Sequence, residues 1–418
     1  MADAPVARSK EGMDSVFADS QEGQAMRIAG AGCCLIDSIY MHCSYTDEAF
    51  KKLWTRQRGD GGLIEGGLVF SEDLQQFANK PYRQILSELV GDRNPDVVNL
   101  GGPAVVALVH AAQILAPHHV EVSFYGAVGT DTLAKQVRDA TGPSPLHMHL
   151  KEIPDQRTAT TEVFDDPSAR HGKGDRSFIN TIGAAGFFGP HDIPDTFYDA
   201  EVVLLGGTAL VPRLHDGMHT ILEKAKQRGC ITVVGTVYDF RNEKANPNQP
   251  WPLGDEPSYR NIDLLITDEE EALRLTGTHH VDQASQKLIS YGVGALVITR
   301  GALDMLVWSS GTTIRACKLQ HLPVSAYMDA KMAAEPSIRK DTTGCGDNFV
   351  GGVLVSLALQ LVKGKDIDMV DLCAWGAASG GFACTYHGGT YHEQQRGEKA
   401  RLLEPVVHAY RESVGAAR

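Results

Sequence analysis

The sequence predicts an α/β fold built on a mainly parallel sheet with helices on both faces. Short apolar runs rich in Val, Ile and Leu recur along the chain, and amphipathic helical segments separate them. This alternation is typical of a parallel sheet that is buried on both sides. The chain has 418 residues, of which 43% are hydrophobic. That length allows one large domain with a smaller appendage, or two domains.

The predicted strands are the short apolar runs. Residues 26–36 (MRIAGAGCCLI) form the first core strand. Two later segments alternate between polar and apolar residues and are predicted to pair as a hairpin, 158–164 and 176–181. Further core strands are predicted over 120–126, 202–205, 232–237, 264–267 and 296–299.

The predicted helices lie between these strands. One begins at Pro103, a residue that suits the first turn of a helix, and the apolar run 349–362 is predicted to be a buried helix. Residues 38–98 follow the alternation of strands and helices less clearly than the rest of the chain, because charged helical pieces over 47–58 and 71–90 flank a glycine-rich segment. The other helices are predicted over 131–140, 215–228, 269–275 and 281–291.

Charge and composition exclude some functions. The formal net charge of −13 argues against a nucleic-acid partner, since phosphate backbones attract basic surfaces. Residues 1–25 are polar and lack the apolar region of a signal peptide, which predicts a loosely held tail. No run looks long and apolar enough to cross a membrane. The eight cysteines show no metal-binding spacing, so we expect reduced thiols in a cytoplasmic protein.

The run Asp341-Thr-Thr-Gly-Cys-Gly-Asp347 directly precedes the buried helix. Its small residues let backbone N–H groups turn inward around an anion, and the helix N-terminus adds partial positive charge. Asp347 is the next residue of the run, and it is expected to lie where an anion bound at this site would meet a second substrate. An anion cradle beside a carboxylate base is what phosphoryl transfer to an alcohol requires. The thiol of Cys345 could be reactive at this helix end, although its backbone N–H matters more to the chemistry.

This run resembles the C-terminal signature of the ribokinase-like (PfkB) carbohydrate kinases, which usually have Ala or Cys between the two glycines. Residues 26–37, 99–142, 157–186 and 261–301 add similar stretches in the order of the family. The resemblance implies a three-layer ribokinase-like fold with a small β-sheet lid. It also implies that the γ-phosphoryl group of ATP is transferred to a hydroxyl of a small sugar or sugar acid.

The resemblance further divides the chain into a core and a lid. The kinase core is expected over 26–37, 99–156 and 183–418, and the lid over 38–98 and 157–182. Because residues 38–98 are more numerous than compact members of the family need, we expect an enlarged lid, a homodimer contact, or both.

Individual residues receive roles from the same resemblance. Asp347 is the catalytic base, and the anion hole consists of the N–H groups of Gly344, Cys345 and Gly346. Substrate contacts are implied for Asp37, Gly101, Gly102 and Arg157. Nucleotide contacts are implied for Asp268, Glu271, Thr299, Arg300, Gly301 and Ala377. Glu271 would also help to position Mg²⁺ through water. A monovalent cation, K⁺, would lie near Asp341, Ala383, Tyr386 and Gly388.

Several of these residues have plain structural alternatives. Asp37 could cap a strand end, the Gly101–Gly102 pair could be a turn that starts a helix, and Arg157 could be a solvated surface residue. The acidic turn from Asp268 to Glu271 could simply favour the dipole of its helix. The family has a sugar-binding Asn where this chain has Val105 or Val106, depending on the alignment, so its sugar contacts must differ.

Other functions fit the sequence less well than a kinase. The turn Gly30-Ala-Gly32 hints at dinucleotide binding, but Leu35 replaces the third glycine and no helix follows. A Walker-type loop is absent. Among enzymes, a nucleoside (adenosine-like) kinase is the nearest alternative, although residues 176–185 resemble a sugar-kinase lid strand more closely. A non-catalytic sugar or nucleotide sensor could share the fold, but the presence of Asp347 argues against it.

Overall fold

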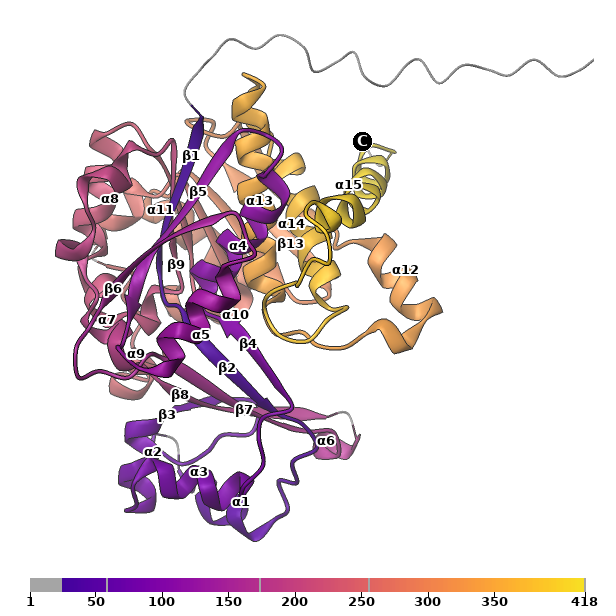
Figure 1. Ribbon diagram of the computed structural model, residues 1–418. Coiled ribbons are helices and arrows are strands. Elements are labelled where there is room, and N and C mark those ends of the chain that lie inside the picture. The colour runs from indigo at the N-terminus through magenta and orange to yellow at the C-terminus, as the bar shows by residue number, and fades with distance from the viewer. Residues whose placement is uncertain (1–24, 58, 173, 255, 417–418) are drawn as a thin grey trace, which may run out of the picture.

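The computed structural model describes residues 25–57, 59–172, 174–254 and 256–416. The tail predicted over 1–25 lies outside this range, apart from its last residue. In the described part of the chain, the strands form one nine-stranded sheet and one five-stranded sheet. Figure 1 shows the large sheet between layers of helices, with the small sheet and its own helices at one end. The mainly parallel α/β fold with a second small sheet is therefore confirmed.

The large sheet has the order β14-β13-β12-β11-β10-β9-β1-β5-β6. All neighbours from β12 to β6 run parallel, and only β13 and β14 are antiparallel. The strands are β1 Met26–Gly32, β5 Val120–Val128, β6 Leu146–Glu152, β9 Val202–Gly206, β10 Ile231–Gly235, β11 Leu264–Asp268, β12 Ala295–Arg300, β13 Leu303–Ser309 and β14 Cys317–Leu322.

Alternate residues of the central strands enter two separate hydrophobic clusters. In β9, Val202 and Leu204 face one cluster, whereas Val203 and Leu205 face the other. The first cluster lies under α4 Pro103–Leu115, α13 Cys345–Val362, α14 Met369–Ala383 and α15 Glu398–Ala416. The second lies under α7 Pro212–Asp216, α8 Met218–Gln227, α10 Glu269–Thr276 and α11 Val281–Tyr291. Burial on both faces explains why these strands read as continuous apolar runs.

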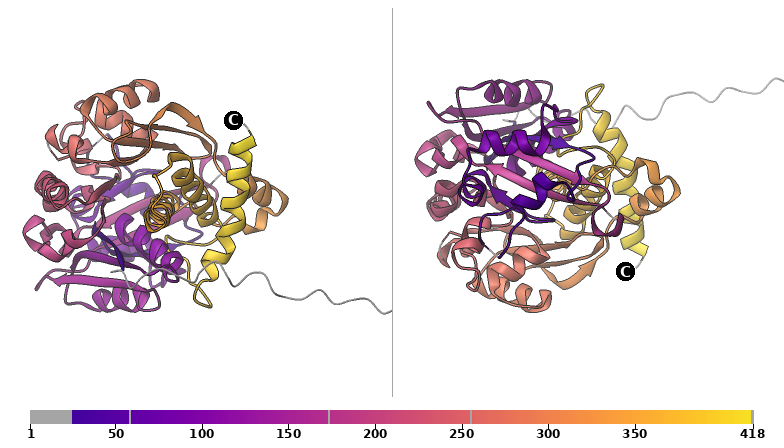
Figure 2. Two further views of the ribbon diagram at one scale, coloured as in Figure 1. Left: turned by 90° about the horizontal axis from the view of Figure 1, so that it is seen from above. Right: turned by 90° about the horizontal axis from the view of Figure 1, so that it is seen from below.

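The small sheet has the order β3-β8-β7-β2-β4, and the predicted hairpin is its antiparallel pair β7/β8. The strands are β2 Leu35–Tyr40, β3 Leu68–Phe70, β4 Val97–Gly101, β7 Thr160–Asp166 and β8 Asp175–Thr181. The right-hand view of Figure 2 shows this sheet and its helices lying across one end of the molecule.

Three helices of the predicted enlargement cover the outer face of the small sheet. They are α1 Glu48–Leu53, α2 Ser71–Ala78 and α3 Tyr82–Val90. Tyr40, Phe164 and Ile179 of the sheet pack against Phe50 and Ile85 of these helices in a third hydrophobic cluster. The enlargement therefore thickens the small sheet from outside, and a homodimer contact there remains a prediction.

The first strand differs from its prediction. The apolar run 26–36 is divided between β1 in the large sheet and β2 in the small sheet, with Cys33 and Cys34 between them. A Cβ on Gly32 would lie 2.3 Å from the carbonyl oxygen of Gly206, and a Cβ on Gly102 would lie 2.3 Å from that of Cys33. The small sheet thus begins at Leu35, three residues before the predicted start of the lid.

The remaining helices include two that differ from the expectation. The segment 71–90, predicted to be one helical piece, forms two helices, α2 and α3. The break occurs because Asn79 adopts a left-handed conformation (φ 51°) and Pro81 follows it. Within the described residues, α13 is long and apolar enough to cross a membrane, contrary to the expectation for the sequence, but it packs between α4 and α14. The others are α5 Thr132–Thr141, α6 Ala169–Gly172, α9 Phe240–Ala245 and α12 Ala326–Ala334.

Candidate active site

The loop before α13 carries the predicted anion site. Gly344 has a φ of 75°, and a Cβ there would lie 2.6 Å from the Cα of Gly389, so only glycine fits this turn. A Cβ on Gly346 would meet nothing within 4 Å. The loop therefore packs tightly on one side and leaves open space at the start of the helix, where an anion could approach.

The three predicted anion-hole amides are not equivalent. The N–H of Cys345 donates to the carbonyl of Thr342 at 3.2 Å. The described residues offer no acceptor to the N–H groups of Gly344 and Gly346. The side-chain amide of Asn348 fixes the loop by donating to the carbonyls of Gly344 and Gly389, both at 2.8 Å. Two amides are thus free for a ligand, while the third closes the turn.

Asp347 lies in the first turn of α13 and faces a pocket of about 140 Å³. In the described part of the chain, no group forms a hydrogen bond or ion pair with its carboxylate. Burial raises its pKa to about 6. The pocket lies at the carboxyl ends of β9, β10 and β11 and is also lined by Thr236, Asp268, Glu271 and Thr299. This edge of a parallel sheet is where ligands bind in open α/β folds.

Asp37 approaches the same region from the small sheet. It lies on β2 with 8% of its surface exposed. A Cβ on Gly101 would lie 2.2 Å from its Oδ2, which explains the glycine on the neighbouring strand. Burial, followed by the charge of Asp347, raises the pKa of Asp37 to about 7, whereas a hydrogen bond from Thr161 lowers it. The charge of Asp347 acts on Asp37, so the two carboxyl groups lie near each other, although Asp37 does not line the Asp347 pocket.

Asp268 and Glu271 form a capping box at the start of α10, as the plain structural interpretation predicts. Asp268 accepts from the N–H of Glu271 at 2.7 Å, and Glu271 faces back toward the N–H of Asp268. The Thr236 hydroxyl donates to the buried Glu271 carboxylate. Burial, and then the charge of Asp268, raises the pKa of Glu271 to about 8. Both residues also line the Asp347 pocket, so the cap does not exclude a functional role.

The Asp347 pocket is rich in carboxyl groups, whose pKa values are raised. Its described lining contains the three carboxylates of Asp268, Glu271 and Asp347 and no basic side chain. Mg²⁺ prefers such oxygen ligands and keeps much of its water shell, so these carboxyl groups suit contact with the ion through water, whereas no three His, Cys, Asp or Glu side chains among the described residues are placed to hold a metal ion directly. Of the other predicted nucleotide residues, Thr299 lines the pocket, and Arg300 pairs with Glu269 at 3.1 Å. Gly301 turns with a φ of 62°.

Asp341 forms an ion pair instead of standing free for a monovalent cation. Arg176 of β8 donates to its Oδ1 and to the Thr343 hydroxyl, the latter at 2.7 Å. The N–H groups of Thr343 and Gly388 also donate to the carboxylate. Burial opposes the shift, but the charge of Arg176 lowers the pKa of Asp341. The guanidinium thus supplies the positive charge that was predicted to come from K⁺, and it joins the small sheet to the anion loop.

Three other predicted residues make structural contacts, and their predicted roles in binding stay predictions. Tyr386 donates its hydroxyl to Asn348 Oδ1 at 3.0 Å, and Ala383 is buried in α14. Ala377, predicted to face the base, is 6% exposed and belongs to the main core. These contacts support the loop from behind.

Arg157 is not brought to the site. It is exposed, and no carboxylate among the described residues pairs with it. Its charge lowers the pKa of Glu162, although burial raises that pKa overall. Glu162 bonds to Tyr82 of α3 on the outer face of the small sheet. The predicted substrate contact of Arg157 is therefore unsupported, and the surface alternative fits better.

Several residues near the loop escaped the sequence analysis. Asn99 of β4 donates to the carbonyl of His387 at 3.0 Å and so ties the small sheet to the segment after α14. Lys399 of α15 is fully buried and donates to Gln113 and Asn348, each at 3.2 Å. Burial lowers the pKa of Lys399 to about 7. A polar residue in an apolar strand was the only sequence signal for Asn99, and Lys399 gave none.

Two thiols meet beside the anion loop. The sulfur atoms of Cys345 at the start of α13 and Cys384 at the end of α14 are 3.4 Å apart, and both residues are partly exposed. The hydrogen bond with Cys345 lowers the pKa of Cys384 to about 7. The backbone holds this contact, since the carbonyl of Cys384 accepts from the N–H of Lys340 at 2.8 Å.

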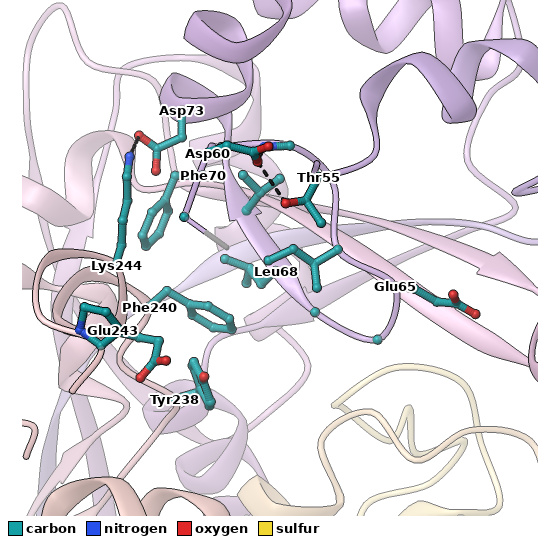
Figure 3. Close-up of a pocket in the computed structure, with 18 of the residues that line it drawn as sticks. Thr55, Asp60, Glu65, Leu68, Phe70, Asp73, Tyr238, Phe240, Glu243 and Lys244 are labelled. Atoms are coloured by element: carbon teal, nitrogen blue, oxygen red, sulfur yellow. Dashed lines mark hydrogen bonds and ion pairs between the residues drawn. The ribbon is translucent and has the colours of Figure 1, made fainter. Parts of the chain in front are cut away.

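A larger pocket of about 570 Å³ opens between β3 and the segment after β10 (Figure 3). Phe70, Tyr238 and Phe240 contribute aromatic rings to its wall, and Lys244 bridges to Asp73 at 2.6 Å. The segment after β10 contributes to both pockets. Thr236 and Val237 line the small pocket, and Tyr238 and Phe240 line the large one.

Comparison with known proteins gives a family match and a set of similar folds. The model of the pfkB family carbohydrate kinases matches residues 96–396. No curated protein sequence matches the chain. A probable sugar kinase from Rhizobium etli CFN 42 is 17% identical, with a TM-score of 0.65, covering 91% of this chain and 100% of that one.

Two further solved structures are similar. Anopheles gambiae adenosine kinase, in complex with P1,P4-di(adenosine-5) tetraphosphate, is 19% identical with a TM-score of 0.63, covering 86% of this chain and 96% of its own. Arabidopsis thaliana ribokinase, complexed with ribose and ATP, is 18% identical with a TM-score of 0.59, covering 91% and 99%. At these identities the likeness establishes the fold.

Proposed function

Because the chain belongs to the pfkB family of carbohydrate kinases, we propose that it transfers the γ-phosphoryl group of ATP to a hydroxyl of a small sugar or sugar acid. It is a phosphotransferase with an alcohol acceptor, of the carbohydrate and nucleoside kinase type. One observation carries the proposal: Asp347 stands unpaired among the described residues, in a pocket beside Gly346, whose N–H is free.

In the proposed reaction, Asp347 accepts the hydroxyl proton as the new O–P bond forms. A base in this position contributes roughly 10²–10⁴-fold to the rate. The free N–H groups of Gly344 and Gly346 stabilise the charge that grows on the transferred phosphoryl group. Asp37 accepts hydrogen bonds from other substrate hydroxyls and so orients the reacting one. The small sheet acts as the lid that keeps water, a competing acceptor, out of the site.

Mg²⁺ belongs to this proposal as the cofactor of ATP. Asp268 and Glu271 would hold it through water molecules, because both carboxylates line the pocket and no basic side chain among the described residues neutralises them. When bound, the ion neutralises the phosphate oxygens. A role for K⁺ has less support, since Asp341 already has Arg176 as its partner.

A substrate screen tests the proposed function directly. Purified protein with ATP and Mg²⁺ is incubated with panels of sugars, sugar acids and nucleosides, and release of ADP is measured. We expect acceptor-dependent ADP release with a subset of one panel. If ATP and an acceptor both raise the melting temperature but no acceptor supports turnover, the sensor alternative is correct.

The activity should depend on pH through the carboxyl groups of Asp347 and Asp37. Asp347 and Asp37 must both be ionised, and their pKa values are raised to about 6 and about 7. We therefore expect kcat/KM to increase with pH through this range and to level off above it. Below pH 6 the logarithmic slope should approach 2, because both groups are then protonated. These values belong to the pair, and a flat profile from pH 5 to 8 would remove both assignments.

The large pocket favours a second candidate, a nucleoside kinase. The paired residues Asp37, Thr161, Asn180 and Phe70 form one row across the small sheet. Three strand spacings separate its ends, about 14 Å, and a sugar at Asp37 could extend a base toward Phe70. The Asn180 side chain donates to Thr161 at 3.0 Å, while its own buried oxygen has no partner in the described residues. That oxygen could accept a bond from the substrate.

The charge of the same pocket disfavours a sugar acid at this end. Its lining carries five carboxylates against two basic side chains, Lys244 and Arg274. Those carboxylates are Asp60, Glu65, Asp73, Glu243 and Glu270. A neutral planar group is therefore the better occupant.

Replacing Phe70 by alanine separates these substrates. Stacking on an aromatic side chain is worth about 1–3 kcal/mol per base, so Phe70→Ala should raise the KM for a nucleoside roughly 5–150-fold. The KM for the corresponding free sugar should not change. Phe187→Ala is the matched control, because that ring is 36% exposed and stacks with Arg213. Equal effects of Phe70→Ala on nucleoside and free sugar would contradict the nucleoside candidate.

A further inference from the structure

We propose that Cys345 and Cys384 form a site of reversible thiol oxidation, with peroxides as the class of oxidant and an intramolecular disulfide as the product. The two sulfur atoms are already in contact at 3.4 Å. A disulfide requires a separation of about 2.05 Å, so the sulfurs need to approach by only about 1.4 Å. Each residue is partly exposed, so a small oxidant can reach the pair.

The surrounding backbone keeps the two thiols together. Cys384 directly follows α14 as its C-cap residue, and its carbonyl accepts from the N–H groups of Lys340 and Asp341, at 2.8 and 3.4 Å. Cys345 begins α13 only four residues after Asp341. A Cβ on Gly380 would lie 3.1 Å from the carbonyl oxygen of Cys345. The end of α14 therefore lies directly against the start of α13.

The oxidation balances with hydrogen peroxide as the oxidant. The sulfur of Cys384 or Cys345 attacks one peroxide oxygen, the O–O bond breaks, and a sulfenic acid and one water form. The second sulfur then attacks the sulfenic sulfur, the S–O bond breaks, and a second water leaves. Two thiols lose two electrons and two protons, and one peroxide becomes two waters. A dithiol reductant reverses the bond by exchange.

The bond would act on the predicted anion loop, so its effect on activity rests on the proposed function. Closing it draws the first residue of α13 toward α14. Gly346 follows at once and Asp347 lies two residues on, both facing the reaction pocket. A misplacement of about 1 Å can cost on the order of 100-fold in rate. We expect oxidation to lower turnover at least 10-fold and dithiothreitol to restore it.

Formation of the disulfide can be detected without measuring enzyme activity. The full-length protein is treated with hydrogen peroxide, blocked with an alkylating reagent and digested with trypsin under non-reducing conditions. Cleavage after Lys363 and Lys365 puts Cys345 and Cys384 on separate peptides. We expect a linked pair of peptides, lighter by two hydrogens than their sum. Recovery of both cysteines only as unlinked sulfinic acids would overturn the proposal.

Two variants separate this site from other thiols. Cys384→Ala should keep its activity under reducing conditions, give no linked peptide and resist peroxide. Cys317→Ala is the matched control, because Cys317 is also free and partly exposed but lies on the edge strand β14; it should remain as sensitive as the unchanged protein. If Cys384→Ala loses activity reversibly with peroxide, the proposed site is wrong. If the linked peptide forms but no acceptor is phosphorylated, the thiol site stands and the kinase assignment fails.

Discussion

Replacing Asp347 by asparagine is expected to lower kcat roughly 10²–10⁴-fold, while the KM for ATP stays near its original value. Asparagine has the same shape, so the contour of the pocket shared with Gly346 and Glu271 is preserved. Its amide cannot take up the hydroxyl proton, because it has no basic oxygen comparable to a carboxylate. Steady-state rates measured over a range of ATP and acceptor concentrations provide both parameters.

Stability distinguishes this effect from misfolding. Burial raises the pKa of Asp347 from 3.8 to about 6, so the folded state binds the proton more tightly than the unfolded state. Folding stability therefore falls as pH rises between these values, and the full penalty is present above pH 6. Asparagine carries no charge, so the melting temperature at pH 7.5 should be unchanged or higher.

Asp304→Asn provides the control for the loss of a carboxylate, because Asp304 is exposed on β13. It should change neither kcat nor melting temperature. Near-normal turnover in Asp347→Asn would remove the base assignment. A loss of turnover that follows a lowered melting temperature would show that the carboxylate supports the fold.

Replacing Asp37 by alanine is expected to raise the KM for the acceptor while the KM for ATP stays constant. A hydrogen bond to a charged group contributes about 1.5–3 kcal/mol. Loss of two such bonds should lower kcat/KM by roughly 10²–10⁴-fold. The KM for the acceptor is measured by varying the acceptor at saturating ATP, and the KM for ATP by varying ATP at saturating acceptor.

The variant Asp37→Asn refines this test. It keeps the contact with Gly101 and one acceptor oxygen, so its KM should fall between those of the unchanged protein and the alanine variant. The acid limb of kcat/KM should then show one ionisation instead of two. If Asp37→Ala alters only the affinity for ATP, the acceptor does not bind at this carboxylate.

The sequence was most informative where function is local. Asp341 to Asp347 form a continuous run before an apolar helix, so their arrangement as a loop and helix N-terminus follows from small residues and helix chemistry. The alternation of apolar runs and helices predicted the sheet correctly. In both cases the signal lies within a short window of residues.

Contacts between distant segments gave no such signal. Arg176 meets Asp341 across 165 positions, and Asn99 meets His387 across 288. Pairings of this kind are set by how the two sheets lie together. The sequence predicts one strand over 26–36, because apolar periodicity does not mark where a chain leaves one sheet for another. Strands β13 and β14 and helix α15 were also missed; β14 is only partly buried and carries a weak apolar pattern.

The third hydrophobic cluster, between the small sheet and helices α1, α2 and α3, affects how this sheet can move. A sheet that shares its own core with three helices, through Phe50 and Phe164 among others, resists bending and would swing as a rigid body. At two crossings to the large sheet, Gly102 and Gly183 adopt φ angles of 107° and 50°, a conformation that favours glycine. The small sheet is held against the rest of the fold by the ion pair between Arg176 and Asp341 and by the hydrogen bond from Asn99 to the carbonyl of His387, so we expect both contacts to break if this sheet moves away.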